Sequence, residues 1–265
     1  MSTLPDGAWA WIVVNISGGK DSQTVLKEVI HRANLSGFPK DRIVASHQCL
    51  GRMEWPGTLD LVRQHADHYG IRLEVTKYQD VRGQNLTLLD YVRKRGKWPS
   101  SQQRYCTSEF KRAPGGRVLT QLSRERPGNI LHVFGFRAEE SASRRKRQVL
   151  VSQPRFATRA REVWEWLPIH TWTEKRVWED IRASGVPWHP AYDLGMPRLS
   201  CCFCIFAPRA ALIVAGKANR ELLDEYCDVE QEIGHTFQNG RALSEVREAI
   251  LAGEVPGEMD GNWNM

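Results

Sequence analysis

The sequence has no apolar run that approaches the roughly 18 residues needed to cross a bilayer. Its first residues, MSTLPDG, lack the basic-then-apolar order of a secretion signal, and no internal repeat is visible. Compositional disorder is also excluded, because 41% of the 265 residues are hydrophobic and only 26% are charged. We therefore expect a cytoplasmic protein with a buried core and no membrane association.

There is little excess of one charge outside a single segment. The chain has 37 Lys and Arg against 31 Asp and Glu, a formal net charge of +6. Residues 137–161 hold eight basic and two acidic side chains, which leaves 29 of each sign elsewhere. This segment has little periodicity and predicts either a solvated loop or a loop that binds nucleic-acid phosphates. Its basic residues are Arg137, Arg144, Arg145, Lys146, Arg147, Arg155, Arg159 and Arg161.

Apolar runs and helical patterns alternate through the first half of the chain. Strands are predicted at residues 9–16, 42–46, 71–75 and 129–135, with helices at 22–35, 59–69 and 86–92. This alternation indicates an α/β fold with a doubly wound parallel sheet. Further helices are expected at 173–184, between the Thr173 N-cap and Gly185, and at 219–233. We place a boundary near residue 165, between a nucleotide-binding domain (1–165) and a smaller, mainly helical, cysteine-bearing region (166–265).

Residues 17–22 read Ser-Gly-Gly-Lys-Asp-Ser and lie between the first predicted strand and its helix. The two glycines allow a tight turn and a close backbone approach to a ligand. The N-terminus of the helix offers N–H groups and a positive dipole end to phosphate, and Lys20 adds a charge. Asp21 beside phosphates is explained if Mg²⁺ lies between them. The segment predicts a phosphate-binding loop; the alternative is a Gly-Gly turn with a helix cap.

This loop is not a Walker A loop, which has four residues between its first glycine and GK[ST]. It resembles the motif of the PP-loop ATP pyrophosphatases (adenine nucleotide alpha hydrolase superfamily), which cleave ATP between the α- and β-phosphates to adenylate a substrate. Three further segments resemble the phosphoadenosine phosphosulfate (PAPS) reductase family: GFRAEES at 135–141 followed by Arg144, residues 167–178, and residues 185–195. Together these segments cover most of residues 11–205 in order.

The resemblance implies binding of ATP with Mg²⁺ and catalytic roles for Lys20, Asp21 and Arg137. The residues that it implies for nucleotide binding are Ser17, Gly18, Gly19, Lys20, Asp21, Ser22, Ser46, Gly135, Arg137, Glu140 and Arg144.

Two departures favour ATP activation over simple PAPS reduction. The first loop of PAPS reductases generally lacks the lysine and aspartate found here, and their catalytic cysteine lies in a C-terminal E-C-G-I-H segment. The nearest counterpart here, at residues 232–235, is Glu-Ile-Gly-His. We therefore expect pyrophosphate release and adenylation of a substrate in sulfur metabolism or nucleic-acid sulfur modification. The alternatives are a PAPS or adenylyl-sulfate reductase that uses a clustered cysteine, and a non-catalytic nucleotide- and nucleic-acid-binding module with a structural metal.

The six cysteines are few and unevenly placed, which favours metal or redox use over a disulfide framework. Cys201 and Cys204 form a C-x-x-C pair, and Cys106 is a third candidate ligand. Similar sets occur in iron–sulfur-bearing members of the PAPS reductase-like family, so the resemblance implies a [4Fe–4S] cluster. The fourth candidate ligand is Cys227, whose alternative interpretation is a small core residue. Zn²⁺ is the competing metal, completed by His189 or His235. A metal-free pair of buried cysteines is the remaining alternative.

The expected partners follow from the same motifs. An adenine nucleotide is expected at the loop, and a sulfur donor protein is a further candidate. DNA or RNA is a candidate for Arg144, Arg145, Lys146 and Arg147.

Overall fold

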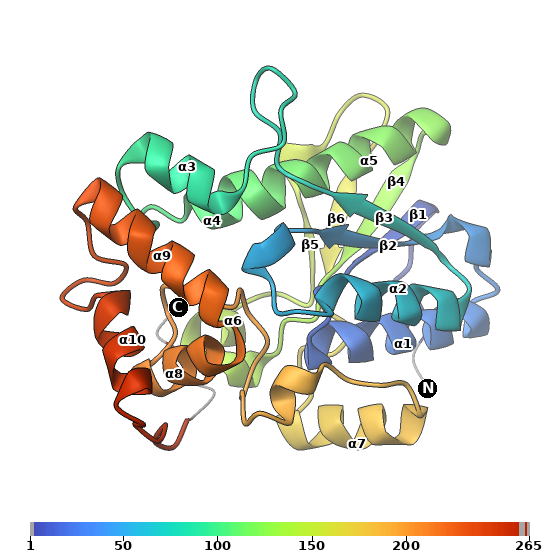
Figure 1. Ribbon diagram of the computed structural model, residues 1–265. Coiled ribbons are helices and arrows are strands. Elements are labelled where there is room, and N and C mark those ends of the chain that lie inside the picture. The colour runs from blue at the N-terminus through green and yellow to red at the C-terminus, as the bar shows by residue number, and fades with distance from the viewer. Residues whose placement is uncertain (1–2, 260–262, 264–265) are drawn as a thin grey trace. The chain divides into compact units, whose positions relative to one another are not determined.

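The computed structural model describes residues 3–259 and residue 263. Within residues 3–259, six strands form one sheet in the order β3-β2-β1-β4-β6-β5, parallel except for the antiparallel edge strand β5 (Figure 1). The predicted α/β class with a mainly parallel sheet is confirmed. The strands are β1 (Trp9–Asn15), β2 (Ile43–Gln48), β3 (Arg72–Thr76), β4 (Asn129–Val133), β5 (Leu150–Ser152) and β6 (Val163–Trp166).

The helices agree with the predicted ones where the apolar spacing is strong, as in α1, α2, α3, α7 and α9. They are α1 (Lys20–Leu35), α2 (Thr58–Tyr69), α3 (Leu88–Arg95), α4 (Tyr105–Thr107), α5 (Ala113–Glu125), α6 (Ala142–Arg145), α7 (Glu174–Ser184), α8 (Arg209–Ala218), α9 (Arg220–Ile233) and α10 (Leu243–Leu251). Thr173 caps α7 by accepting from the Arg176 backbone N–H, and Gly185 ends the helix with a φ of +68°. None of these helices is long and apolar enough to cross a membrane.

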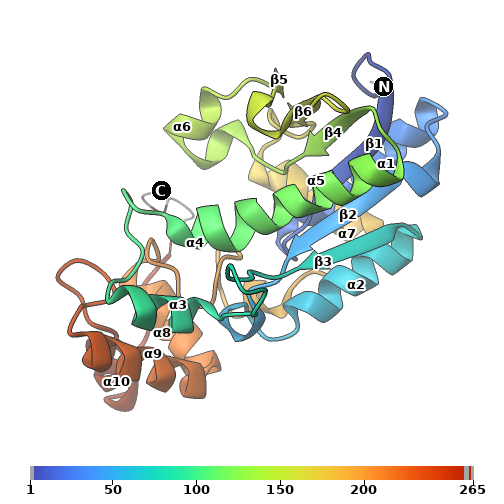
Figure 2. The same ribbon diagram turned by 90° about the horizontal axis from the view of Figure 1, so that it is seen from above.

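Both faces of the sheet are covered by helices. Helices α1, α2 and α7 cover one face and α5 covers the other (Figure 2). Ile12 and Val14 of β1 belong to the core formed with α1, α2 and α7, whereas Trp11 and Val13 belong to the core formed with α5. Successive strand residues point to opposite faces, so a strand covered on both sides is apolar at every position. This explains the nearly continuous apolar run of β1.

The chain forms two compact units whose segments alternate along the sequence, rather than two units divided at residue 165. Unit 1 contains residues 1–48, 57–76 and 114–189, and unit 2 contains residues 49–56, 77–113 and 190–265. Unit 1 holds the sheet with α1, α2, α6 and α7 and all but the first residue of α5. Unit 2 has its own core, in which Met53, Leu89, Leu212 and Tyr226 are fully buried. The difference from the predicted boundary arises because the segments that follow β2 and β3 both contribute to unit 2.

A widened helical turn precedes α5. The chain passes from α4 through the π-helical turn η3 (Ser108–Arg112) directly into α5. Pro114 has no N–H to donate, and its ring would clash with the carbonyl of Phe110 in a regular α-helix. A π-turn relieves this clash by widening the backbone. Lys111 therefore lies in the turn that Pro114 widens, and Cys106 lies in the helical turn before it.

The charged segment at 137–161 is more ordered than the sequence predicts. It contains α6, the edge strand β5 and the short 3-10 turn η5 (Pro154–Phe156). Its basic residues are distributed before and after β5, which pairs with β6 in antiparallel register from Leu150↔Trp166 to Ser152↔Trp164. Arg144–Arg147 therefore lie toward the carboxyl end of β6, and Arg155–Arg161 lie toward its opposite end.

A neutral histidine is buried in the middle of this sheet. His132 of β4 is 5% exposed, and its Nε2 lies 2.5 Å from Asn15 Nδ2. Burial lowers the pKa of His132 to about 3. The folded protein therefore keeps this ring uncharged at a pH where an unfolded chain would protonate it.

His132 is predicted to make folding pH-dependent. Because its pKa is depressed in the folded state, its contribution is complete above about pH 6.5 and is lost as the pH falls toward 3. Between pH 6.5 and 5 the loss amounts to about 2 kcal/mol. Urea unfolding at both pH values should show a smaller loss for His132→Gln than for the wild type. The exposed control His31→Gln should match the wild type; equal losses in all three proteins contradict the prediction.

Candidate functional site

The loop between β1 and α1 is held closed by Ser22. Its Oγ donates to the Gly19 carbonyl at 2.8 Å and accepts from the Ser17 backbone N–H at 3.1 Å. Gly18 has a φ of +76°, a conformation that a side chain disfavours. Gly19 is the N-cap of α1 and makes no side-chain capping bond. The start of α1 therefore lacks a side-chain cap, as phosphate-binding helix N-termini require.

The parallel strands bring several predicted residues to the same edge of the sheet. The backbone N–H of Ile16 donates to the Ser46 carbonyl at 3.0 Å, so the loop begins beside the carboxyl end of β2. Ser46 is buried, and its Oγ accepts from Gln48 Nε2. On the other side of β1, Gly135 follows the carboxyl end of β4.

Gly135 lies in contact with the first turn of α1. A Cβ on Gly135 would lie 2.7 Å from the Asp21 carbonyl oxygen and 3.2 Å from the Ser22 backbone nitrogen. Real Cβ atoms do not approach backbone this closely, so only glycine fits. The glycine at position 135 thus lets the segment after β4 lie against the loop between β1 and α1.

A network of charged side chains links this segment to the loop. Arg137 Nε donates to Asp21 Oδ1 at 2.5 Å, and its Nη1 donates to Glu139 Oε2 at 2.6 Å. Lys20 Nζ lies 3.8 Å from Asp21 Oδ2 and 3.6 Å from Glu174 Oε1. Three carboxylates from different segments therefore surround two buried cations, since Lys20 is 3% exposed and Arg137 is 2% exposed.

Arg137 makes its hydrogen bonds within this network. Besides Asp21 and Glu139, its Nη1 lies 3.5 Å from the Trp172 carbonyl and its Nη2 lies 3.9 Å from Glu174. Burial opposes the charged guanidinium, but the adjacent carboxylates Asp21 and Glu140 raise the pKa of Arg137. In this structure Arg137 holds the Asp21 carboxylate in place, and its own exposed surface is small.

The other basic residues near the loop divide into paired and unpaired groups. Arg144 pairs with Glu140, and Arg147 pairs with Glu165. Glu140 also accepts from the Arg137 backbone N–H at 2.8 Å. Among the residues that the structure describes, no carboxylate lies within 4.0 Å of the exposed Arg145 or Lys146. Two of the four residues expected to contact nucleic acid are therefore engaged by carboxylates.

Three of the predicted metal ligands, Cys106, Cys201 and Cys204, are electrostatic neighbours in unit 2. Burial raises the pKa of the Cys106 and Cys204 thiols, and the charge of Cys201 is the next largest cause. The pKa of Cys204 is raised to about 11. The charge of Cys201, followed by those of Cys106 and Cys204, raises the pKa of Lys111. The structure therefore brings Cys106 to the C-x-x-C pair despite a separation of about 95 residues in sequence.

Cys227 faces a different set of charges. Its pKa is raised to about 11 by burial, and the charged groups that act on it are Arg247, Glu230, Asp224 and Asp228, none of them a cysteine. Cys202 is buried and accepts from Asn219 Nδ2 at 3.1 Å. Cys227 lies in the hydrophobic core of unit 2, against which Cys106, Cys201 and Cys204 also pack, and its place as a fourth ligand stays a prediction.

The two histidines considered as zinc ligands have partners elsewhere. His189 Nε2 lies 3.1 Å from Thr58 Oγ1 in unit 1, and His235 Nδ1 lies 2.9 Å from the Thr236 carbonyl.

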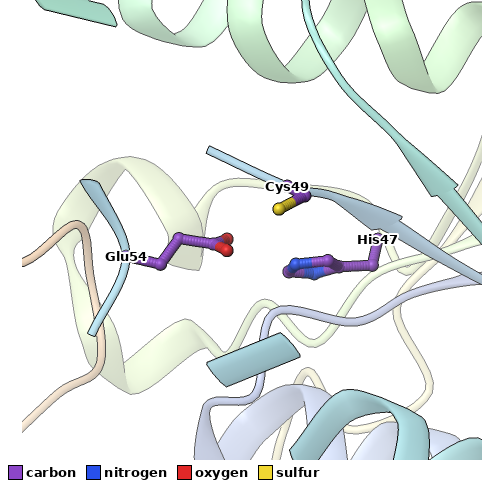
Figure 3. A group of neighbouring side chains, drawn as sticks. All are labelled: His47, Cys49 and Glu54. Atoms are coloured by element: carbon purple, nitrogen blue, oxygen red, sulfur yellow. The ribbon is translucent and has the colours of Figure 1, made fainter. Parts of the chain in front are cut away.

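The ligand atoms of His47, Cys49 and Glu54 lie within 4.8 Å of one another, and all three come from the short stretch around the end of β2 (Figure 3). Cys49 is buried here. Among the described residues, no group within this distance includes Cys106, Cys201 or Cys204.

Residues 11–207 match the phosphoadenosine phosphosulfate reductase domain. The chain belongs to this family. The adenosine 5'-phosphosulfate reductase of Allochromatium vinosum is 29% identical over 151 residues, which are 56% of this chain and 52% of that protein. An uncharacterized 37.8 kDa protein of Escherichia phage 186 is 27% identical over 124 residues, which are 47% of this chain and 36% of that protein. The chain thus spans about half, or less, of these relatives.

Solved structures with low sequence identity also match this family member. The PAPS reductase of Candida auris is 19% identical, with a TM-score of 0.49 over 72% of this chain and 80% of that one. The U34-tRNA thiolase NcsA of Methanococcus maripaludis, solved with its [4Fe-4S] cluster, is 14% identical, with a TM-score of 0.43 over 94% of this chain and 74% of that one.

Two residues of the charged network were not expected from the sequence. Glu139 lies in the GFRAEES segment, and Glu174 is the first residue of α7. An acidic residue at a helix N-terminus normally indicates interaction with the helix dipole. Glu174 gives no other signal in the sequence, because its contacts with Lys20 and Arg137 depend on how distant segments pack.

Replacing Gly135 by alanine is predicted to destabilise unit 1. Because the new Cβ would meet the Asp21 backbone at 2.7 Å, the segment after β4 must move away from α1. We expect a loss of about 1–3 kcal/mol in the free energy of unfolding, measured with urea. In the control Gly115→Ala, the three atoms nearest the new Cβ belong to the Gln48 side chain, and the nearest is 3.4 Å away. A Gly135→Ala protein as stable as this control contradicts the prediction.

Proposed function

We propose that this protein binds ATP at residues 17–22 and cleaves it between the α- and β-phosphates, adenylating a substrate in sulfur metabolism or nucleic-acid sulfur modification. The observation that carries the proposal is the buried Lys20 ammonium group at the uncapped start of α1. The carboxylates of Asp21 and Glu174 lie within 4.0 Å of this ammonium group, so the proposal rests on where the group lies, beside the N–H groups that begin α1. A polyphosphate fits an ammonium group, helix N–H groups and serine hydroxyls within one loop.

The proposed reaction is an in-line displacement at the α-phosphorus. An oxygen of the substrate forms the new bond to phosphorus, and the bond to the bridging oxygen breaks, which releases pyrophosphate. Lys20 and the N–H groups at the start of α1 stabilise the charge that develops on the phosphate oxygens. Arg137 acts through Asp21, whose carboxylate it fixes at 2.5 Å.

Mg²⁺ fits the donor set at the loop. Asp21 is 21% exposed, and its Oδ2 is not the atom that Arg137 holds. This partly exposed Asp21 oxygen is a suitable ligand for Mg²⁺ that the nucleotide brings. The ion would neutralise negative charge on the phosphates.

A [4Fe–4S] cluster fits the cysteines of unit 2 better than one zinc ion does. A zinc ion about 2.3 Å from each sulfur holds the sulfurs about 3.8 Å apart. Cys106, Cys201 and Cys204 form no group within 4.8 Å among the described residues. In a cluster each cysteine binds a different iron, so the sulfurs are further apart. Cys106, Cys201 and Cys204 would hold such a cluster, which can bind sulfur or tune the local electrostatics.

The second candidate is a reductase that acts on PAPS or adenylyl sulfate. The similarity to the A. vinosum adenosine 5'-phosphosulfate reductase favours it. Against it, residues 232–235 contain no cysteine: Glu232 and Ile233 end α9, and Gly234 caps it with a φ of +61°. Sulfite release from either sulfonucleotide in the presence of thioredoxin separates this candidate from ATP cleavage.

Lys20→Ala is predicted to abolish pyrophosphate release from ATP, because no other side chain in residues 17–22 carries a positive charge. Pyrophosphate production by purified protein with Mg²⁺ is the direct measurement. The matched control is Lys27→Ala on the same helix, where the lysine pairs with Asp180 at 2.7 Å and should not affect turnover. If the wild type leaves ATP intact while reducing a sulfonucleotide, the second candidate replaces the first.

Purification without oxygen is predicted to yield a brown protein with absorbance near 400 nm and bound iron and sulfide. Cys106→Ser, Cys201→Ser and Cys204→Ser should each lose most of this iron. Cys227→Ser is the matched control and should retain it, because its surroundings are Arg247 and acidic residues rather than cysteines. Stoichiometric zinc without sulfide would assign the site to zinc instead.

A further inference from the structure

Glu174 contacts both buried cations of the loop without being fixed by either. Its Oε1 lies 3.6 Å from Lys20 Nζ and its Oε2 lies 3.9 Å from Arg137 Nη2. Both distances are longer than those of a direct hydrogen bond. The side chain is 44% exposed, although Lys20 and Arg137 are almost completely buried.

The backbone of Glu174 is held more firmly than its side chain. Thr173 caps α7, and the Glu174 backbone N–H donates to Glu139 Oε2 at 2.6 Å. Glu139 in turn accepts from Arg137. The start of α7 is therefore anchored beside the loop while the Glu174 carboxylate is free to rotate into solvent.

Asp21 cannot move in the same way. Arg137 Nε holds its carboxylate at 2.5 Å, and its backbone lies in the first turn of α1 against Gly135. Of these two carboxylates near Lys20, only Glu174 can leave without breaking a short hydrogen bond. A phosphate group that binds Lys20 would come close to the Glu174 carboxylate, and two anions at one ammonium repel each other.

We propose that Glu174 is a displaceable carboxylate that neutralises Lys20 in the nucleotide-free protein and is expelled when a phosphate group binds. This inference rests on the proposed binding of ATP at residues 17–22. Glu174 would then contribute to ligand specificity. A ligand that does not bring a phosphate group to Lys20 would leave the Glu174 carboxylate beside Lys20. The class of ligand that the site admits is then the polyphosphate of a nucleotide.

The test compares the affinity of ATP for the wild type and for Glu174→Gln, measured by titration calorimetry with Mg²⁺. Removing the competing charge should strengthen ATP binding by about two- to fivefold, the range for a partly exposed ion pair. Adenosine carries no phosphate, so its affinity should be the same for both proteins.

The matched control is Glu179→Gln, which removes an exposed negative charge from the same helix. Glu179 lies 3.9 Å from Lys175 and is 58% exposed. The affinity of the Glu179→Gln protein for ATP should equal that of the wild type. This control separates the effect at Lys20 from a general change in charge. Glu174→Ala, checked by thermal unfolding, should change ATP affinity in the same direction as Glu174→Gln.

Unchanged or weaker ATP binding by a folded Glu174→Gln protein would overturn the inference; weaker binding would make Glu174 a ligand of the nucleotide or its metal. ATP binding by the wild type with no gain in the variant leaves the proposed function intact. Failure of both proteins to bind ATP would refute the proposed function and this inference with it.

Discussion

The geometry of the candidate site depends on the contact between Gly135 and the first turn of α1. A Cβ at this position would lie 2.7 Å from the Asp21 carbonyl, so the segment after β4 reaches the loop only because residue 135 is glycine. The contact brings Arg137 within hydrogen-bond distance of Asp21, and the pairing then orients Glu139 and the start of α7. Loss of this contact would separate the carboxylates from the cations that they surround.

The loop and its neighbours could be predicted because their signals are local. Glycine pairs, helix caps and apolar periodicity act over a few residues, and the expected start of α7 at Thr173 agrees with the structure. The pairing of Arg144 with Glu140 is also local, because the two residues are four apart and only the extended Ser141 separates the 3-10 turn η4 (Ala138–Glu140) from α6. The contacts of Glu174 had no local signal in the sequence, because they join segments that are far apart in the chain.

Unit 2 was harder to predict for a different reason. Its segments alternate with those of unit 1, so no single change of composition marks a boundary. The grouping of Cys106 with Cys201 and Cys204 was expected from the family resemblance, and the structure brings these residues together. Whether Cys227 joins them depends on which face of α9 it occupies. It is buried in the core of unit 2, and its role as a fourth ligand stays a prediction.

The two edge strands have a consequence for solubility. An exposed strand edge can pair with another molecule and start aggregation. At one edge, β5 is only three residues long and offers few free backbone groups. At the other edge, Arg72 and Glu74 of β3 form ion pairs, and Arg72 also binds Glu125. A short strand and a charged strand thus end the sheet, which disfavours strand addition between copies of the protein.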